Sequence, residues 1–122
     1  MRLHVWACAA LLLPLFAAVG GCHSYQVSCT VVNRTGATIH LMEVDYPSAG
    51  FGTDSLANGA SYPYRFQIRG SGPVDVQYTE SATHKVIKIA GPAVREDQEG
   101  RLEIVLLPGG KAQFHAELNP PA

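Results

Sequence analysis

The sequence predicts an all-β protein: an antiparallel β-sandwich of about seven short strands that follows a cleaved N-terminal signal. Three observations lead to this prediction. From Ser24 onward, apolar and polar side chains alternate with a period of two, turn residues recur about every ten positions, and no stretch has the period of a helix. Two sheets packed face to face would bury the apolar stripes, whereas a single open sheet would leave them in water.

The first two strands are predicted on either side of a polar turn. Tyr25 to Val31 has apolar residues at alternate positions and ends at the turn-like cluster Asn33-Arg34-Thr35-Gly36. In the next run, Ala37 to Tyr46, the apolar residues begin on one phase and finish on the other. Because one extra residue reverses the facing of everything after it, we expect a bulge near Met42 or Glu43.

The middle of the chain contains the strongest turn signals. Pro47-Ser48-Ala49-Gly50 breaks the second strand, and Phe51 to Leu56 fits either a short strand or a loop. Asn58-Gly59 is the dipeptide most typical of a hairpin turn. The clearest alternation runs from Tyr62 to Arg69, where Pro63 indicates an edge or a strand start because proline lacks a backbone donor.

The second half of the chain predicts four further strands. They cover Val74 to Thr79, Lys85 to Ala90, Leu102 to Leu106 and Ala112 to Leu118. The first of them should form a hairpin with the strand before it, through Gly70-Ser71-Gly72-Pro73. The charged segment Arg95 to Gly100 is expected to be a solvated connection.

The N-terminus has the pattern of an export signal: Arg2, then an apolar run from Val5 to Val19, then small residues. Val19-Gly20-Gly21-Cys22 resembles the bacterial lipobox. This resemblance implies that the Cys22 thiol is joined to diacylglycerol, that the chain is cut before Cys22, and that the new amino terminus is acylated. Residues 1–21 would then be a lipoprotein signal peptide, and residues 22–122 a single β-sandwich domain.

Two other interpretations of this segment remain open. An uncleaved anchor is disfavoured because a helix needs about 20 apolar residues to cross a bilayer, and Pro14 interrupts the run. Ordinary cleavage after Gly20 fits the small residues Ala18 and Gly20. Under the lipobox interpretation several acyl chains would hold the protein stably at the membrane, and His23 would favour the outer membrane, facing the periplasm.

Net charge and cysteine content argue against nucleic-acid binding and against a disulfide-stabilised fold. Removal of Arg2 with the signal leaves eight Lys and Arg against ten Asp and Glu, a net charge of −2, which argues against a nucleic-acid partner. Cys8 lies in the signal and Cys22 would be a thioether, so no disulfide framework remains. Cys29 falls on the apolar phase of its strand, where we expect a buried, inert thiol.

No motif for catalysis is present. The sequence has no Gly-x-Ser-x-Gly nucleophile turn, no recognisable Cys-His pair and no glycine loop of the phosphate-binding kind. Glu43, Asp45 and Asp54 lie near the Gly-rich bend, and a carboxylate pair for acid–base chemistry stays an open alternative there. We therefore predict that the protein is not an enzyme and uses no cofactor.

One group of residues suggests a binding surface. Aromatic side chains gather around Pro47 to Ser61, a segment rich in Gly and Ser that we expect to present a binding loop, with an arginine on the neighbouring strand. The candidate binding residues are Tyr46, Phe51, Tyr62, Tyr64 and Arg65. The alternative is that these aromatics cap the end of the core.

The sequence thus predicts a membrane-tethered, non-catalytic lipoprotein that acts as an interaction or structural module in the bacterial envelope, with an envelope protein as partner. The alternative is a periplasmic carrier of a small ligand or of copper or zinc. Such a carrier would bring His40, His84 and His115 together, with Met42 as a soft ligand. Surface histidines are the simpler expectation, because no ligand spacing supports a site.

Overall fold

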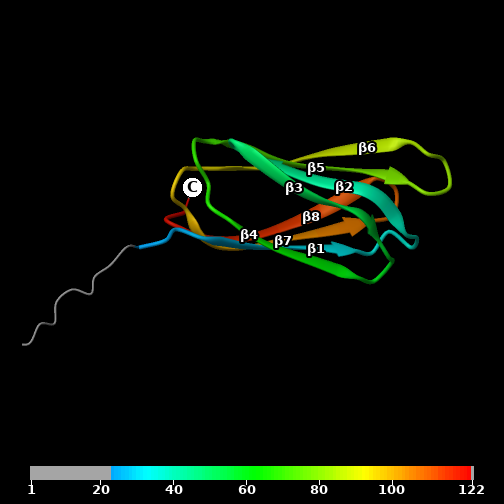
Figure 1. The fold of residues 1–122 in the computed structure, drawn as a ribbon, viewed down its shortest axis with the longest axis horizontal. Coiled ribbons are helices and arrows are strands. Elements are labelled where there is room, and N and C mark those ends of the chain that lie inside the picture. The colour runs from blue at the N-terminus through cyan, green and yellow to red at the C-terminus, as the bar shows by residue number, and fades with distance from the viewer. Residues whose placement is uncertain (1–22, 122) are drawn as a thin grey trace, which may run out of the picture.

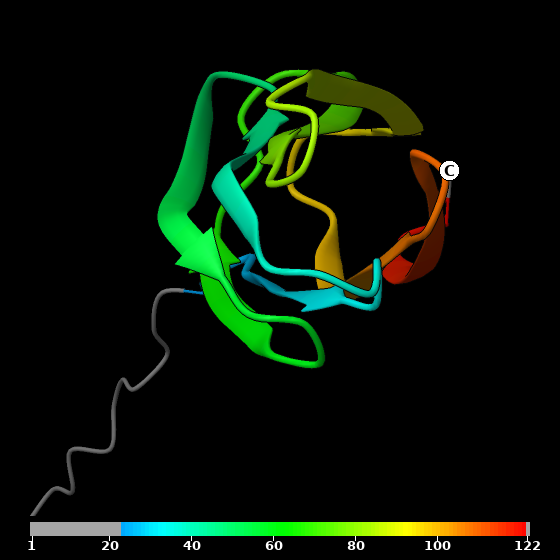
Figure 2. The same ribbon diagram turned by 90° about the vertical axis from the view of Figure 1, so that its right-hand side faces the viewer.

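The computed structural model describes residues 23–121 and folds them into two four-stranded β-sheets packed face to face (Figures 1 and 2). The predicted signal and Cys22 lie outside the described residues. The strands are β1 (Val27–Asn33), β2 (Ile39–Tyr46), β3 (Ala49–Leu56), β4 (Ser61–Phe66), β5 (Gly72–Glu80), β6 (Val86–Val94), β7 (Glu99–Leu107) and β8 (Lys111–Asn119). The described residues form no helix, and so none that could span a membrane.

The all-β, two-layer prediction is confirmed, with eight strands instead of seven. The additional strand is β3, so the segment that fitted either a strand or a loop is a strand, paired with β2 across the turn at Pro47 and Ser48. The predicted short strand at Lys85 to Ala90 also extends further, to Val94, because a register shift opposite Pro73 and Asp75 carries β6 past Gly91 and Pro92.

The strand order is β4-β1-β7-β8 in one sheet and β3-β2-β5-β6 in the other. The prediction of a wholly antiparallel sandwich is wrong in one place, since β1 and β7 pair in parallel. Each connection reverses the chain along the long axis of the molecule (Figure 1), so odd-numbered strands run the same way. Two odd-numbered strands that become neighbours must therefore be parallel.

Two predicted hairpins are also wrong. Asn58-Gly59 turns the chain, with Gly59 at φ +84°, but it joins β3 to β4, which belong to different sheets. The turn after β4 likewise leads into β5 of the opposite sheet. Alternation of side chains fixes which face of a strand is buried, but it does not distinguish strands that pair from strands that pack across the core. The prediction that Pro63 marks an edge strand is confirmed, because β4 is an edge.

The predicted bulge in the second strand is confirmed. The register between β2 and β5 shifts between His40 and Glu43, and Leu41 has a φ of +51°. Ile39 before the bulge and Met42 after it are both buried, although an unbroken alternation would have put them on opposite faces. The extra residue thus keeps both halves of β2 facing the core.

The core lies between the sheets and contains the apolar stripes of the central strands. Cys29 is part of it, with an exposed fraction of 1%, and burial raises the pKa of its thiol to about 12. The thiolate is therefore disfavoured at neutral pH. The expectation of a buried cysteine at this position is confirmed.

A buried amide side chain closes each end of the core. Asn33 is fully buried at the end of β1. Its Nδ2 donates to the carbonyl oxygens of Ala37 (2.8 Å) and Leu56 (2.9 Å), and its Oδ1 accepts from the backbone N–H and the hydroxyl of Thr35 (2.9 and 2.8 Å). This one amide therefore ties the loop before β2 to the end of β3.

Gln98 occupies the corresponding position at the opposite end. Its Oε1 accepts from the backbone N–H of Arg95 (2.7 Å), and its Nε2 donates to the carbonyl oxygen of Pro120 (2.7 Å). Only 1% of Gln98 is exposed. The expectation of a fully solvated connection at Arg95 to Gly100 is thus wrong for this residue, which binds the C-terminal segment to the β6–β7 turn.

We predict that Asn33→Ala lowers the free energy of unfolding by about 2 to 4 kcal/mol, because it leaves buried carbonyl and N–H groups without partners. Urea denaturation measures the loss. Asn58→Ala is the matched control, since exposed Asn58 accepts a single hydrogen bond from the backbone of Gly36 (2.9 Å). Equal losses for the two variants would contradict the role given to Asn33.

Candidate functional site

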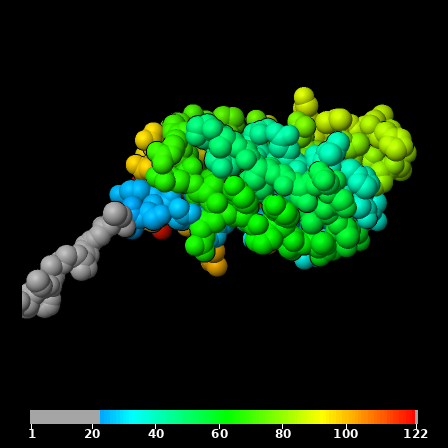
Figure 3. All heavy atoms as spheres, viewed as in Figure 1, coloured from blue at the N-terminus to red at the C-terminus, as the bar shows by residue number. Residues whose placement is uncertain are grey.

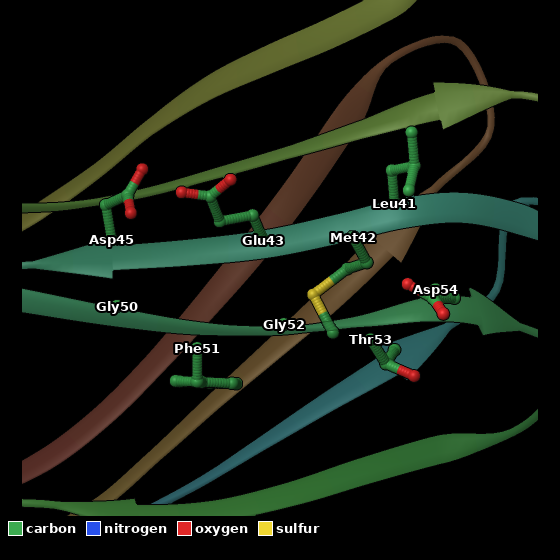
Figure 4. A pocket seen from close by; sticks show the side chains of 9 residues that line it. All are labelled: Leu41, Met42, Glu43, Asp45, Gly50, Phe51, Gly52, Thr53 and Asp54. Atoms are coloured by element: carbon green, nitrogen blue, oxygen red, sulfur yellow. The ribbon is translucent and has the colours of Figure 1, made fainter.

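The outer face of β2 and β3 carries an open groove of about 440 Å³ (Figure 4). Glu43 and Asp45 project from β2 on this face, whereas Met42 and Phe51 point to the other side of the sheet. The lining residues are Leu41, Met42, Glu43, Asp45, Gly50, Phe51, Gly52, Thr53 and Asp54.

Two glycines of β3, Gly50 and Gly52, lie in this groove, which we call the acidic groove because Glu43, Asp45 and Asp54 line it. Gly50 pairs with Asp45 and Gly52 pairs with Glu43. A Cβ at position 52 would collide with the carbonyl oxygen of Met42, and a Cβ at position 50 would lie 2.5 Å from the Asp45 carboxylate. The close packing of β2 against β3 thus requires glycine at these positions. Because glycine has no side chain, the backbone of edge strand β3 stays accessible to an approaching chain.

The groove is negatively charged. Glu43, Asp45 and Asp54 line it, and Asp75 lies directly opposite Asp45 on β5. Protonated Glu43 can donate a hydrogen bond to the side chain of Asp45, and this bond, together with the negative charge of Asp45, raises the pKa of Glu43 above the ordinary value of 4.5. Of the ion pairs formed within residues 23–121, neither involves these carboxylates. The groove therefore attracts positively charged groups.

Metal binding is not supported in the part of the chain that the structure describes, because no three His, Cys, Asp or Glu side chains converge there as ligands. His40 lies on β2 and His115 on β8, in different sheets, while His84 is in the β5–β6 turn. Met42 is buried, with an exposed fraction of 1%. The set of ligands required by the carrier alternative is not brought together.

The predicted aromatic residues do come together, along the seam where edge strands β3 and β4 of the two sheets meet. The rings of Tyr46 and Phe66 stack with centroids 3.9 Å apart, and the rings of Phe51 and Tyr64 stack at 4.3 Å. The centroid of Tyr62 lies 6.1 Å from that of Phe51. This aromatic seam closes one side of the sandwich.

The core-capping interpretation is confirmed for some of the aromatics. Tyr46 and Phe51 are buried and cap the core, whereas Tyr64 has an exposed fraction of 40% and offers a ring to the surface. The predicted binding loop is wrong, because residues 47–61 are mostly β3 and the aromatics stand on strands. Arg65 is exposed but follows Tyr64 in an extended strand, so it projects from the opposite face of β4 and does not join the stack.

Sequence reasoning identified the carboxylates near the Gly-rich bend but missed the groove itself. The signal was present in the alternation of acidic residues at positions 43 and 45, opposite glycines at 50 and 52. It could be interpreted only once the pairing of β2 with β3 was known. Leu41 was missed for a similar reason: the bulge places this apolar side chain on the surface, 61% exposed, beside the groove.

Comparisons with known proteins give a fold and no family. Neither the protein-family models nor the curated proteins give a match. A solved structure similar to this one is the NMR structure of a protein from Eubacterium rectale, with a TM-score of 0.55 and 13% sequence identity, covering 84% of this chain and 97% of that chain. The likeness supports the sandwich architecture alone.

We predict that Glu43→Gln stabilises the protein above about pH 5 and has little effect at pH 3. The folded state raises the pKa of Glu43 and so binds its proton more tightly than the unfolded state does. The contribution of Glu43 to the free energy of unfolding is therefore present at low pH, and it is lost as the pH rises through the pKa that Glu43 has in the folded state. Thermal unfolding between pH 3 and 7 measures the effect.

Asp45→Asn is the matched variant, because it removes the charge that perturbs Glu43. It should weaken the same pH dependence. An unchanged pH profile in both variants would show that the two carboxylates do not interact.

Proposed function

We propose that this protein is a lipid-anchored, non-catalytic interaction module of the bacterial envelope, joined to the membrane through Cys22. The resemblance of Val19-Gly20-Gly21-Cys22 to the lipobox supports the anchor. His23 after the cysteine supports the periplasmic face of the outer membrane. The absence of catalytic sequence motifs supports a role in binding.

The observation that carries this proposal is the short distance along the chain between the acceptor cysteine and the folded body. His23 directly follows Cys22, its Nε2 lies 2.9 Å from Oε1 of Glu99 at the start of β7, and its ring packs against Tyr25 with centroids 4.4 Å apart. Figure 3 shows the first described residues against one end of the body. Acyl chains on Cys22 would thus hold the sandwich at the bilayer surface without a linker.

The partner surface that we propose is the β3–β4 side, where the acidic groove and the exposed ring of Tyr64 flank an edge strand. Such an edge can accept an extended segment of another chain by main-chain pairing. Glu43, Asp45 and Asp54 favour a segment with basic side chains. We therefore propose an envelope protein with an extended basic segment as the partner.

A carrier of copper or zinc is not proposed further, because the described part of the chain assembles no ligand set.

We predict that the full-length protein incorporates a labelled fatty acid in a bacterial host and that Cys22→Ser abolishes the label. Cys29→Ala is the matched control and should retain it, since Cys29 is buried in the core. Cys22→Ser should also leave the membrane fraction, because the apolar leader is shorter than a stable span. A labelled or quantitatively membrane-bound Cys22→Ser protein would contradict the anchor.

The proposed partner surface has a separate test. A photoreactive phenylalanine analogue at position 64 should form adducts with another envelope protein in cells. The same analogue at position 25 is the control, because Tyr25 is similarly exposed (36%) but lies beside the anchor. We expect Glu43→Gln combined with Asp45→Asn to reduce the adducts severalfold. Adducts absent from position 64 would refute this surface and leave the anchor unaffected.

A further inference from the structure

The two sides of the sandwich are closed unequally. Aromatic rings stack on the β3–β4 side, but on the β6–β8 side the apolar side chains packed against the core stay only partly buried. Figure 2 shows β6 and β8 at the same side of the two sheets. The partly buried apolar residues on these two strands are Ile87, Ile89, Ala112, Phe114 and Leu118. The ring of Phe114 on β8 reaches across to β6, where it lies against Gly91.

Strand β8 is also an edge strand, and its backbone is regular throughout. It pairs with β7 over nine consecutive residues with no register shift, and it contains neither proline nor glycine. The other three edges are interrupted: β4 contains Pro63, β3 contains Gly50 and Gly52, and β6 is bulged at Gly91 and Pro92. Native proteins usually interrupt or cover their edges, and a long regular edge is one that can accept another strand.

We propose that β8 pairs with β8 of a second copy of this chain, in an antiparallel dimer centred on Phe114. In this register Lys111 of each protomer faces Glu117 of its partner on the outer surface, and the two Phe114 rings meet on the inner surface. Glu117 already accepts from the guanidinium of Arg101 at 2.6 Å. Lys111 of the partner therefore extends this pair into a three-membered charge network.

The charges favour this register over the neighbouring one. An axis through His115 would place two His115 side chains opposite each other and would pair Lys111 with Asn119, so that no opposite charges would face each other. The Phe114 axis forms two symmetric ion pairs and covers apolar surface. A second copy of the chain thus fits the charge pattern of β8 and covers the partly buried apolar residues beside it.

The dimer is independent of the proposed lipid anchor and compatible with it. Antiparallel pairing puts the two ends that bear His23 at opposite ends of the dimer. If both anchors insert into one bilayer, the strands run parallel to the membrane plane. The β3–β4 side stays free, because it is at the opposite edge of each protomer.

Disulfide crosslinking of the full-length protein in cell membranes tests the register. Lys111→Cys combined with Glu117→Cys should give a disulfide-linked dimer, since residues directly opposite on paired strands lie within bridging distance. His115→Cys is the control and crosslinks only in the neighbouring register. A product joined to a different protein, or a dimer from His115→Cys alone, would overturn the proposal.

Sedimentation equilibrium of the full-length protein in mild detergent tests the energetics. Lys111→Glu should raise the dimer dissociation constant about tenfold or more, since it replaces two attractions by two repulsions. Combining it with Glu117→Lys should largely restore the dimer, whereas Glu117→Lys alone should weaken it. A folded monomer at every concentration, or a double variant weaker than both single variants, would contradict the dimer.

Discussion

The mutual burial of two alternating faces is the interaction on which this structure depends. Each sheet alone would expose an apolar stripe along every strand, and only the opposite sheet covers it. The ends of the layered core are closed by polar groups with satisfied hydrogen bonds, Asn33 at one end and Gln98 at the other. Each of these amides bonds to a segment distant in the sequence, Asn33 to Leu56 and Gln98 to Pro120, and so joins two segments at its end of the core.

The same constraint explains what could be predicted from the sequence. Alternation identified most of the strands and their inner faces, and the reversal of phase in β2 predicted a bulge near Met42 or Glu43, close to Leu41, where the structure has it. Strand pairing could not be predicted, because the stripes of β3 and β4 look alike whether the strands share a sheet or face each other. The parallel pairing of β1 with β7 depends on contacts between distant segments, which a local pattern does not contain.

In the candidate site, too, some features could be predicted from the local sequence and others depend on how the strands pair. Tyr46, Phe51 and Tyr64 were identified from their proximity in sequence, and their rings do meet at one seam, where Tyr64 stacks on Phe51 and Tyr46 is tilted against Phe51. Their roles could not be predicted, since burial depends on which strand lies across the seam. The groove required the register of β2 with β3, which sets glycines opposite carboxylates. Physically, the molecule has one side closed by aromatic rings and flanked by negative charge, and another side whose apolar residues are only partly buried.

The proposed function is that of a body that works by contact with partners. The proposed anchor supplies the location, the acidic β3–β4 side a partner surface, and the β8 edge a second copy. The central claim is that Cys22 carries the lipid. Mass spectrometry of the mature N-terminus, from protein isolated out of a bacterial membrane, tests this most directly. The account predicts a first residue of Cys22 bearing diacylglycerol and an acyl chain; an intact leader or a free Cys22 thiol would contradict it.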